Sequence, residues 1–191
     1  MPVLQSEQSV YPDFLFQNTE EHDTKELVGE ERRWHVMHTR PRQEKCLARQ
    51  LLDGQVPFYL PLVARRFRIR GRTVTSHVPL FAGYVFVLAD ELERLTALAT
   101  RRIVQPLVVK DQDGLWRDLR RIEQLIASGA PITPEDRLGP GAKVRIRSGP
   151  LAGLEGTILR TSSGRRLIVQ VNFIQRGASV LLDDFAVVEL N

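Results

Sequence analysis

The sequence predicts an α+β protein made of two domains. The first is an α/β sandwich with a mixed, mainly antiparallel four-stranded sheet and three helices, and the second is a small five-stranded β-barrel. Two observations carry this prediction. Pro79–Leu88 is apolar and uncharged, as is typical of a strand buried on both faces at the centre of a sheet. After Glu135 no helical period recurs, whereas short strands and glycine turns do.

The composition narrows the class of protein. The 191 residues, of which 42% are hydrophobic and 26% charged, are typical of a folded protein with one large or two small domains. No apolar run approaches the ~20 residues that span a bilayer, and no basic segment followed by an apolar one indicates secretion. A single cysteine, Cys46, fits a reducing compartment. We therefore expect a cytoplasmic protein that does not associate with membranes.

The charge is unevenly distributed along the chain. Residues 1–33 include eight acidic and three basic side chains, a net charge of −5, which leaves +9 on the rest of a chain whose total is +4. We expect residues 1–32 to be a disordered acidic tail, because so polar a segment cannot bury enough apolar surface to offset the entropy lost on ordering. A body this basic indicates phosphate backbones or acidic protein surfaces as partners, with ordinary solubility charge as the alternative.

The first domain is expected over residues 33–129. Its alternating and helical periods predict the following elements in chain order: strand Trp34–Thr39, a helix from Pro41 to Leu52, strand Val56–Val63, strand Thr73–Val78, the central strand Pro79–Leu88, helix Asp90–Thr100, strand Ile103–Val109 and helix Leu115–Ser128. Gly83 lies inside the central strand and predicts either a β-bulge or a close approach of another backbone there. Strands and helices joined by short connections are typical of one compact sandwich.

The most distinctive local composition is the run R-R-F-R-I-R-G-R at positions 65–72. Its arginines alternate with Phe67 and Ile69 at the strand period and Gly71 provides a turn, so we expect a β-hairpin tip with arginines on one face. Five guanidinium groups so close together favour contact with phosphates, through Arg65, Arg66, Arg68, Arg70 and Arg72. The alternative is a solvated hairpin whose arginines discourage edge pairing.

The second domain is expected over residues 138–191. Residues 130–137, with two prolines and an acidic pair, are predicted to be the linker that precedes it. Glycine turns separate five short segments in which valine, isoleucine and threonine favour strands over helices. Five short strands imply a barrel, because an open sheet would leave both edges bare.

Two motifs, in this order, resemble the NusG family of transcription elongation factors. Gly139–Gly156 resembles a KOW motif, with a G-x-x-V strand, a G-P turn and a small-residue loop that ends on glycine. Before it, the strand Trp34-His35-Val36, the helix that follows and the run P-L-F-A-G-Y-V-F-V resemble the family's N-terminal domain. The resemblance covers residues 33–191 and leaves the acidic tail outside.

The resemblance implies a monomeric factor that binds the clamp helices of RNA polymerase, suppresses pausing and prevents termination. The family's polymerase-binding patch corresponds here to aromatic residues: Trp34, Phe81 and Tyr84, with Phe58 and Tyr59 as neighbours. Grouped aromatic side chains suit this role, since each buries ~150–250 Å² against a partner helix. On this basis we expect Phe81 and Tyr84 to be presented at the surface.

The resemblance also implies further partners. The family's KOW domain binds ribosomal protein S10 and, in the general factor, the termination factor Rho; the corresponding loop here holds Phe173, Ile174 and Arg176, where general members carry I-F-G-R. The hairpin and the run after it are closer to the specialised RfaH-like paralogues, which serve particular operons and read non-template DNA from a helix. The matching positions are Arg94 and Thr96. Two alternatives stay open: a general housekeeping NusG, and a ribosome-associated KOW protein that binds RNA.

Catalysis is not indicated by the sequence. The four histidines have no metal-ligand spacing, and a single cysteine excludes the common zinc sites. No phosphate-binding glycine loop and no nucleophile motif occur. We expect no metal, no cofactor and no enzymatic activity.

Overall fold

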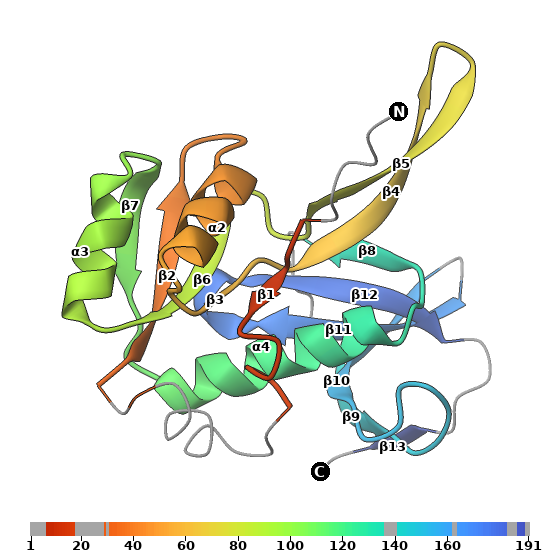
Figure 1. The fold of residues 1–191 in the computed structure, drawn as a ribbon. Coiled ribbons are helices and arrows are strands. Elements are labelled where there is room, and N and C mark those ends of the chain that lie inside the picture. The colour runs from red at the N-terminus through yellow and green to blue at the C-terminus, as the bar shows by residue number, and fades with distance from the viewer. Residues whose placement is uncertain are drawn as a thin grey trace. The chain divides into compact units, whose positions relative to one another are not determined.

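The computed structural model describes residues 7–17, 29, 31–135, 141–161, 164–182 and 187–189 (Figure 1). The chain divides into two compact units, Met1–Gln112 and Asp113–Asn191. The division falls before the predicted linker, so the helix predicted at 115–128 groups with the second unit and not with the first. The described residues form three α-helices and antiparallel sheets, which confirms the α+β class. None of these helices is long and apolar enough to cross a membrane.

The first unit is built on a five-stranded antiparallel sheet with the strand order β1-β3-β6-β2-β7. A separate two-stranded sheet joins β4 to β5. The elements in chain order are β1 (Val10–Tyr11), β2 (Arg33–Thr39), α2 (Glu44–Asp53), β3 (Phe58–Tyr59), β4 (Leu62–Ile69), β5 (Arg72–Pro79), β6 (Tyr84–Ala89), α3 (Glu91–Ala99) and β7 (Ile103–Val108). The single strand predicted at 56–63 is therefore split between β3 and β4.

The central strand β6 pairs with β2 on one side and β3 on the other. Five of its six residues are buried, as the uncharged run predicts. Of the two alternatives predicted for Gly83, the bulge is wrong: Gly83 ends a turn before the strand, with a φ of +86° that glycine adopts at little cost. Its N–H donates to the Glu44 carboxylate at 2.7 Å, and its carbonyl accepts the N–H of Thr39 at 2.8 Å. The turn is thereby tied to both α2 and β2.

One face of the sheet is covered by α2 and α3. Met37, Val85 and Val87 point to this face and pack with α2 and α3 in a core of fully buried side chains. The α2 helix begins at Glu44, three residues later than predicted, because Arg42 has a φ of +62° that a helix cannot include. Asp90 begins α3 with a reciprocal capping box to Glu93, as expected for this residue pair.

The N-terminal segment contradicts the prediction of a disordered tail over the part that is described. Val10 and Tyr11 form β1 and pair with Tyr59 and Phe58, respectively. Leu15 has no exposed surface. Burial of the apolar island at 10–16 against the sheet offsets the entropy that the segment loses on ordering. The acidic composition of the surrounding residues did not indicate this burial. Residues 1–6, 18–28 and 30 of the predicted tail lie outside the described residues.

The second unit contains a six-stranded antiparallel sheet and the helix α4 (Gln112–Ala127), whose first residue is assigned to the first unit. The strand order is β13-β9-β10-β11-β12-β8, with β8 (Ile132–Glu135), β9 (Ala142–Ile146), β10 (Glu155–Thr161), β11 (Gly164–Val171), β12 (Arg176–Leu182) and β13 (Val187–Glu189). The 3₁₀ turn η1 (Asn172–Ile174) joins β11 to β12.

The sixth strand comes from the predicted linker. Residues 132–135 pair with β12 as β8, from Ile132 opposite Val180 to Glu135 opposite Gly177. Pro134 is tolerated because β8 is an edge strand in this order, where a missing N–H can face outward. Residues 136 and 137 of the predicted linker lie outside the described residues.

Replacing Leu15 tests whether the N-terminal segment belongs to the first unit. Leu15→Ala removes a fully buried side chain, and we expect a loss of about 2–4 kcal/mol in the free energy of unfolding, measured by urea denaturation. Phe14→Ala is the matched control, because Phe14 is 39% exposed and its loss should cost less than about 1 kcal/mol. Equal effects of the two substitutions would show that the segment is not part of the core.

Candidate functional site

The face of the sheet opposite α2 and α3 is aromatic. Strand alternation places Trp34, Tyr59 and Phe86 on this face, with Trp34 opposite Leu88 and Tyr59 opposite Phe86 across the ladders. Tyr59 and Phe86 have ring centroids 6.4 Å apart, and Phe81 meets Phe86 edge-on at 6.3 Å. We call Trp34, Tyr59, Phe81, Tyr84 and Phe86 the aromatic face.

The residues predicted to bind polymerase are mostly buried in this structure. Trp34, Phe58, Tyr59 and Phe81 have at most 2% of their surface exposed. Phe58 points to the helix side and belongs to the core there. The expectation that Phe81 is presented at the surface is wrong for this structure, because its ring fills space against Phe86 in the turn before β6.

Tyr84 is the one member of the predicted set that is partly exposed. Its ring stacks on that of His38, its cross-strand partner, with 5.3 Å between centroids and 28° between planes. Sequence reasoning missed His38, because it considered the four histidines only as possible metal ligands. His38 follows Trp34 and Val36 at intervals of two residues. This spacing in a strand was the signal that the three side chains share one face.

The hairpin of β4 and β5 has two chemically different faces. The register pairs Arg66 with Thr75 and Arg68 with Thr73, so these four side chains share one face. Figure 1 shows the hairpin as a long ribbon that extends beyond the five-stranded sheet. The other face carries Phe67, Ile69 and Val74, all more than 40% exposed, together with Arg65 and Arg72. The prediction that the arginines lie on one face is therefore wrong. Arg66 and Arg68 lie on one face, and Arg65 and Arg72 lie on the other.

The positive charge of the hairpin is not neutralised locally. No acidic residue occurs between Gly54 and Ala89. Within the described part of the chain, none of the five guanidinium groups of 65–72 forms an ion pair or a side-chain hydrogen bond; by contrast, Arg32, Arg49 and Arg145 pair with Glu93, Glu7 and Glu155, respectively. Exposed cations without partners are available to phosphates.

The predicted DNA-contacting positions lie on α3. Arg94 donates to Glu91 at 2.8 and 2.6 Å, and this pairing lowers the pKa of Glu91 and raises that of Arg94. Thr96 is exposed, and its hydroxyl donates to the Leu92 carbonyl at 2.9 Å. On α3, Glu93 forms an ion pair with Arg32, the residue before β2, at 2.5 Å. A phosphate at Arg94 would have to compete with Glu91.

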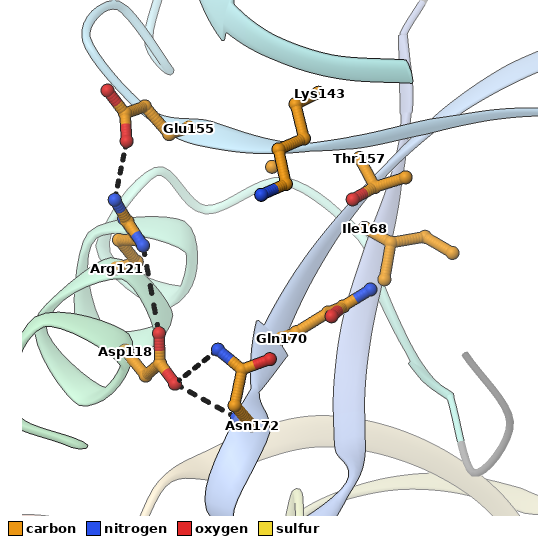
Figure 2. Close-up of a pocket in the computed structure, with 9 residues that line it drawn as sticks. Asp118, Arg121, Lys143, Glu155, Thr157, Ile168, Gln170 and Asn172 are labelled. Atoms are coloured by element: carbon orange, nitrogen blue, oxygen red, sulfur yellow. Dashed lines mark hydrogen bonds and ion pairs between the residues drawn. The ribbon is translucent and has the colours of Figure 1, made fainter. Parts of the chain in front are cut away.

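In the second unit, the predicted partner loop is held by α4. Asp118 accepts both the backbone N–H and the side-chain N–H of Asn172 at 2.9 Å, as Figure 2 shows. These bonds fix the start of η1, which presents Phe173, 36% exposed, and the half-buried Ile174. Arg176, also half-buried, begins β12.

A pocket of about 210 Å³ lies beside this contact. Lys143, Thr157, Ile168 and Gln170 line it opposite Asp118 (Figure 2), with Arg121, Glu155, Gly156 and Asn172 completing the wall. Arg121 bridges Asp118 at 3.7 Å and Glu155 at 2.5 Å. Over the described residues, no group of three histidine, cysteine or acidic side chains is arranged to hold a metal ion.

The two carboxylates of this network have opposite pKa shifts. Burial raises the pKa of Asp118, against the opposing effect of the two Asn172 hydrogen bonds and Arg121. The hydrogen bond from Arg145 holds the pKa of Glu155 below its ordinary value. Two carboxylates with opposite pKa shifts therefore connect α4 to the sheet, one directly through Asn172 and one through Arg121.

The raised pKa of Asp118 predicts how pH affects stability. Above the unfolded pKa the folded state retains a proton that the unfolded chain releases, so the stabilising contribution of Asp118 is largest in acid and falls as pH rises through the folded pKa. The free energy of unfolding of wild type minus that of Asp118→Asn should thus decrease from acidic to neutral pH, as measured by urea denaturation. Glu123→Gln, another change from acid to amide on the same helix, is the control. A pH-independent difference would contradict the assignment.

Comparison with known proteins identifies the family of this chain. The family model described as "Transcription termination factor nusG" matches residues 32–133, just over half of the chain. No curated protein matches the sequence. Among solved structures, one titled "Domain interaction in Thermotoga maritima NusG" is similar at 20% identity with a TM-score of 0.43, covering 80% of this chain and 94% of that one. On the strength of the family match, the chain belongs to the NusG family of transcription factors.

Proposed function

We propose that this NusG-family transcription factor binds the clamp helices of RNA polymerase, suppresses pausing and counteracts termination. The observation that carries the proposal is the family match over residues 32–133, which includes the whole sheet of the first unit from β2 onward. The factor acts by binding and not by catalysis, in the cytoplasm where transcription takes place. It needs no cofactor.

The polymerase contact is proposed at the His38–Tyr84 end of the aromatic face. This stacked pair is half-buried, so it can add contact area without first leaving the core. Trp34, Tyr59 and Phe81 lie on the same face and support the pair, and Phe58 supports β3 from the other side. Aromatic anchors on a rigid sheet lose little conformational entropy when a helix packs on them.

Nucleic acid contact is proposed at the hairpin. Arg65, Arg66, Arg68, Arg70 and Arg72 have no acidic neighbour in the segment, and the non-template DNA strand of the transcription bubble offers phosphates to them. Arg94 and Thr96 are a second proposed contact to that strand, the first of them in exchange for Glu91. Specialisation for particular operons is proposed on the sequence of the hairpin and the run after it, and the genes adjacent to this one would test it.

A protein partner is proposed for the second unit. Phe173, Ile174 and Arg176 form an exposed to half-buried apolar loop with one cation, on a KOW-like sheet. Ribosomal protein S10 or Rho is the proposed partner. Recovery of ribosomal subunits without polymerase in a pulldown would favour a ribosome-associated protein instead.

The polymerase contact predicts the effect of removing the exposed ring pair. Combining His38→Ala with Tyr84→Ala should weaken binding to core polymerase about 30-fold, the loss expected for an aromatic hot spot, as measured by fluorescence anisotropy. The protein should remain folded, because both side chains are only half-buried. Leu92→Ala, which removes an apolar side chain 74% exposed on α3, is the matched control. Unchanged binding by the double variant would refute the location of the site.

The hairpin proposal predicts a change in salt dependence. Replacing Arg66 and Arg68 with glutamine should reduce the slope of log affinity against log salt by about 1.5 for elongation complexes, since each lost phosphate contact removes roughly 0.7–0.9. Replacing the exposed cations Arg101 and Lys110 with glutamine changes the net charge equally and should leave the slope nearly intact. If both pairs act alike, the hairpin contributes only general charge.

A further inference from the structure

The segment Glu7–Gln17, which we call the N-terminal strap, crosses the β3 edge of the sheet and contacts both faces. Tyr11 stacks on Phe58, which belongs to the core on the helix side, with 6.5 Å between centroids. Phe16 lies on the opposite face, where its ring is parallel to that of Trp34 at 6.2 Å and edge-on to Tyr59 at 4.8 Å. The aromatic face is thus covered in part by the chain's own N-terminal segment.

The strap is attached to the sheet by backbone bonds and by side-chain contacts. The β1 ladder comprises two residue pairs, and the Ser9 carbonyl adds one bond by accepting the N–H of Leu60 at 2.6 Å. A side-chain ion pair joins Glu7 to Arg49 of α2, where an exposed arginine adds little stability. Burial of Leu15 and the aromatic contacts of Tyr11 and Phe16 also hold the strap. Such contacts can be exchanged for those of another apolar surface.

Trp34 gives an independent indication that this face receives a partner. Its side chain is 1% exposed, and its indole Nε1–H has no hydrogen-bond partner among the described residues. Its backbone, in contrast, is fully engaged by Gln112, which accepts the N–H at 2.7 Å and donates to the carbonyl at 3.0 Å. A buried donor left unpaired is costly, and a partner that supplies an acceptor would remove that cost.

We propose that the strap is the internal occupant of the polymerase-docking surface, and that polymerase displaces it to reach Trp34 and Tyr59 as well as the His38–Tyr84 pair. This inference rests on the proposed function of the same face. The occupant is identified by the structure itself, since Phe16 is seated on the two rings. When the surface is occupied, the apparent affinity equals the intrinsic affinity multiplied by the fraction of molecules in which the strap is open. The strap would thus restrain binding until polymerase is present at sufficient concentration.

The test compares two phenylalanines of the strap in the full chain. Phe16→Ser removes the contact with Trp34 and Tyr59, whereas Phe14→Ser alters a ring that is 39% exposed. Binding to core polymerase is measured by fluorescence anisotropy. We expect Phe16→Ser to bind at least about fivefold more tightly than wild type and Phe14→Ser to bind like wild type. Equal or weaker binding by Phe16→Ser, with its fold intact by circular dichroism, would overturn the proposal.

Hydrogen exchange of the wild-type protein gives a second readout that does not depend on a variant. The N–H groups of Leu15 and Gln17 donate to the carbonyls of Pro12 and Phe14, each at 2.9 Å, and so report on the strap. Displacement predicts faster exchange in peptides 7–17 when polymerase is bound. Slower exchange would mean that polymerase binds on top of the strap without displacing it. That result would overturn this inference but would still demonstrate polymerase binding. Failure of wild type and Phe16→Ser alike to bind polymerase would overturn the proposed function together with this inference.

Discussion

The first unit depends on a strand that must be buried on both sides. Val85 and Val87 of β6 point to one face and Phe86 and Leu88 to the other, and all four are fully buried. Since an apolar strand of this kind cannot leave either face in water, each face needs its own cover. On one side the cover is the apolar stripe of α2 with Ala97 of α3. On the other it includes aromatic rings from β2, β3 and the N-terminal strap. A structural requirement of the central strand thereby gathers aromatic residues where a helical partner can use them.

The acidic residues of the folded parts are largely used in local pairs. Glu93, Glu155 and Glu91 each hold an arginine close to the body of their own unit. The hairpin, in contrast, has arginines and no acids. Much of the positive charge of the chain is therefore concentrated in a segment that has no acidic residue of its own and no ion pair among the residues that the structure describes. Such a distribution favours long-range attraction to a polyanion over stabilisation of the fold.

Periodicity predicted most of the first unit but not the exposure of its rings. The alternation in Trp34–Thr39 and the uncharged run before Ala89 were sufficient to identify two central strands, because these patterns report burial directly. Whether Phe81 or His38 reaches the surface depends on a turn before β6 and on the cross-strand register, which are tertiary properties. The prolines at 131 and 134 led to the prediction of a linker where residues 132–135 form an edge strand. The acidic composition of the N-terminal segment led to the prediction of disorder, although the segment contains the apolar island that forms the strap. Nothing in the local sequence indicates that Asp118 would hold the turn at Asn172, since 54 positions separate them.

The pairing of β8 with β12 affects how the second unit can be handled as a separate piece. A fragment begun after residue 137 would lack β8 and Asp118 and would leave β12 as an uncovered edge. That edge is uncharged from Gly177 to Leu182, a length and composition that promote strand-to-strand self-association in solution. The strand β8, which comes from the segment between α4 and the KOW-like motif, therefore protects the second unit from self-association. The N-terminal boundary of this unit lies upstream of the boundary that the KOW-like motif suggests.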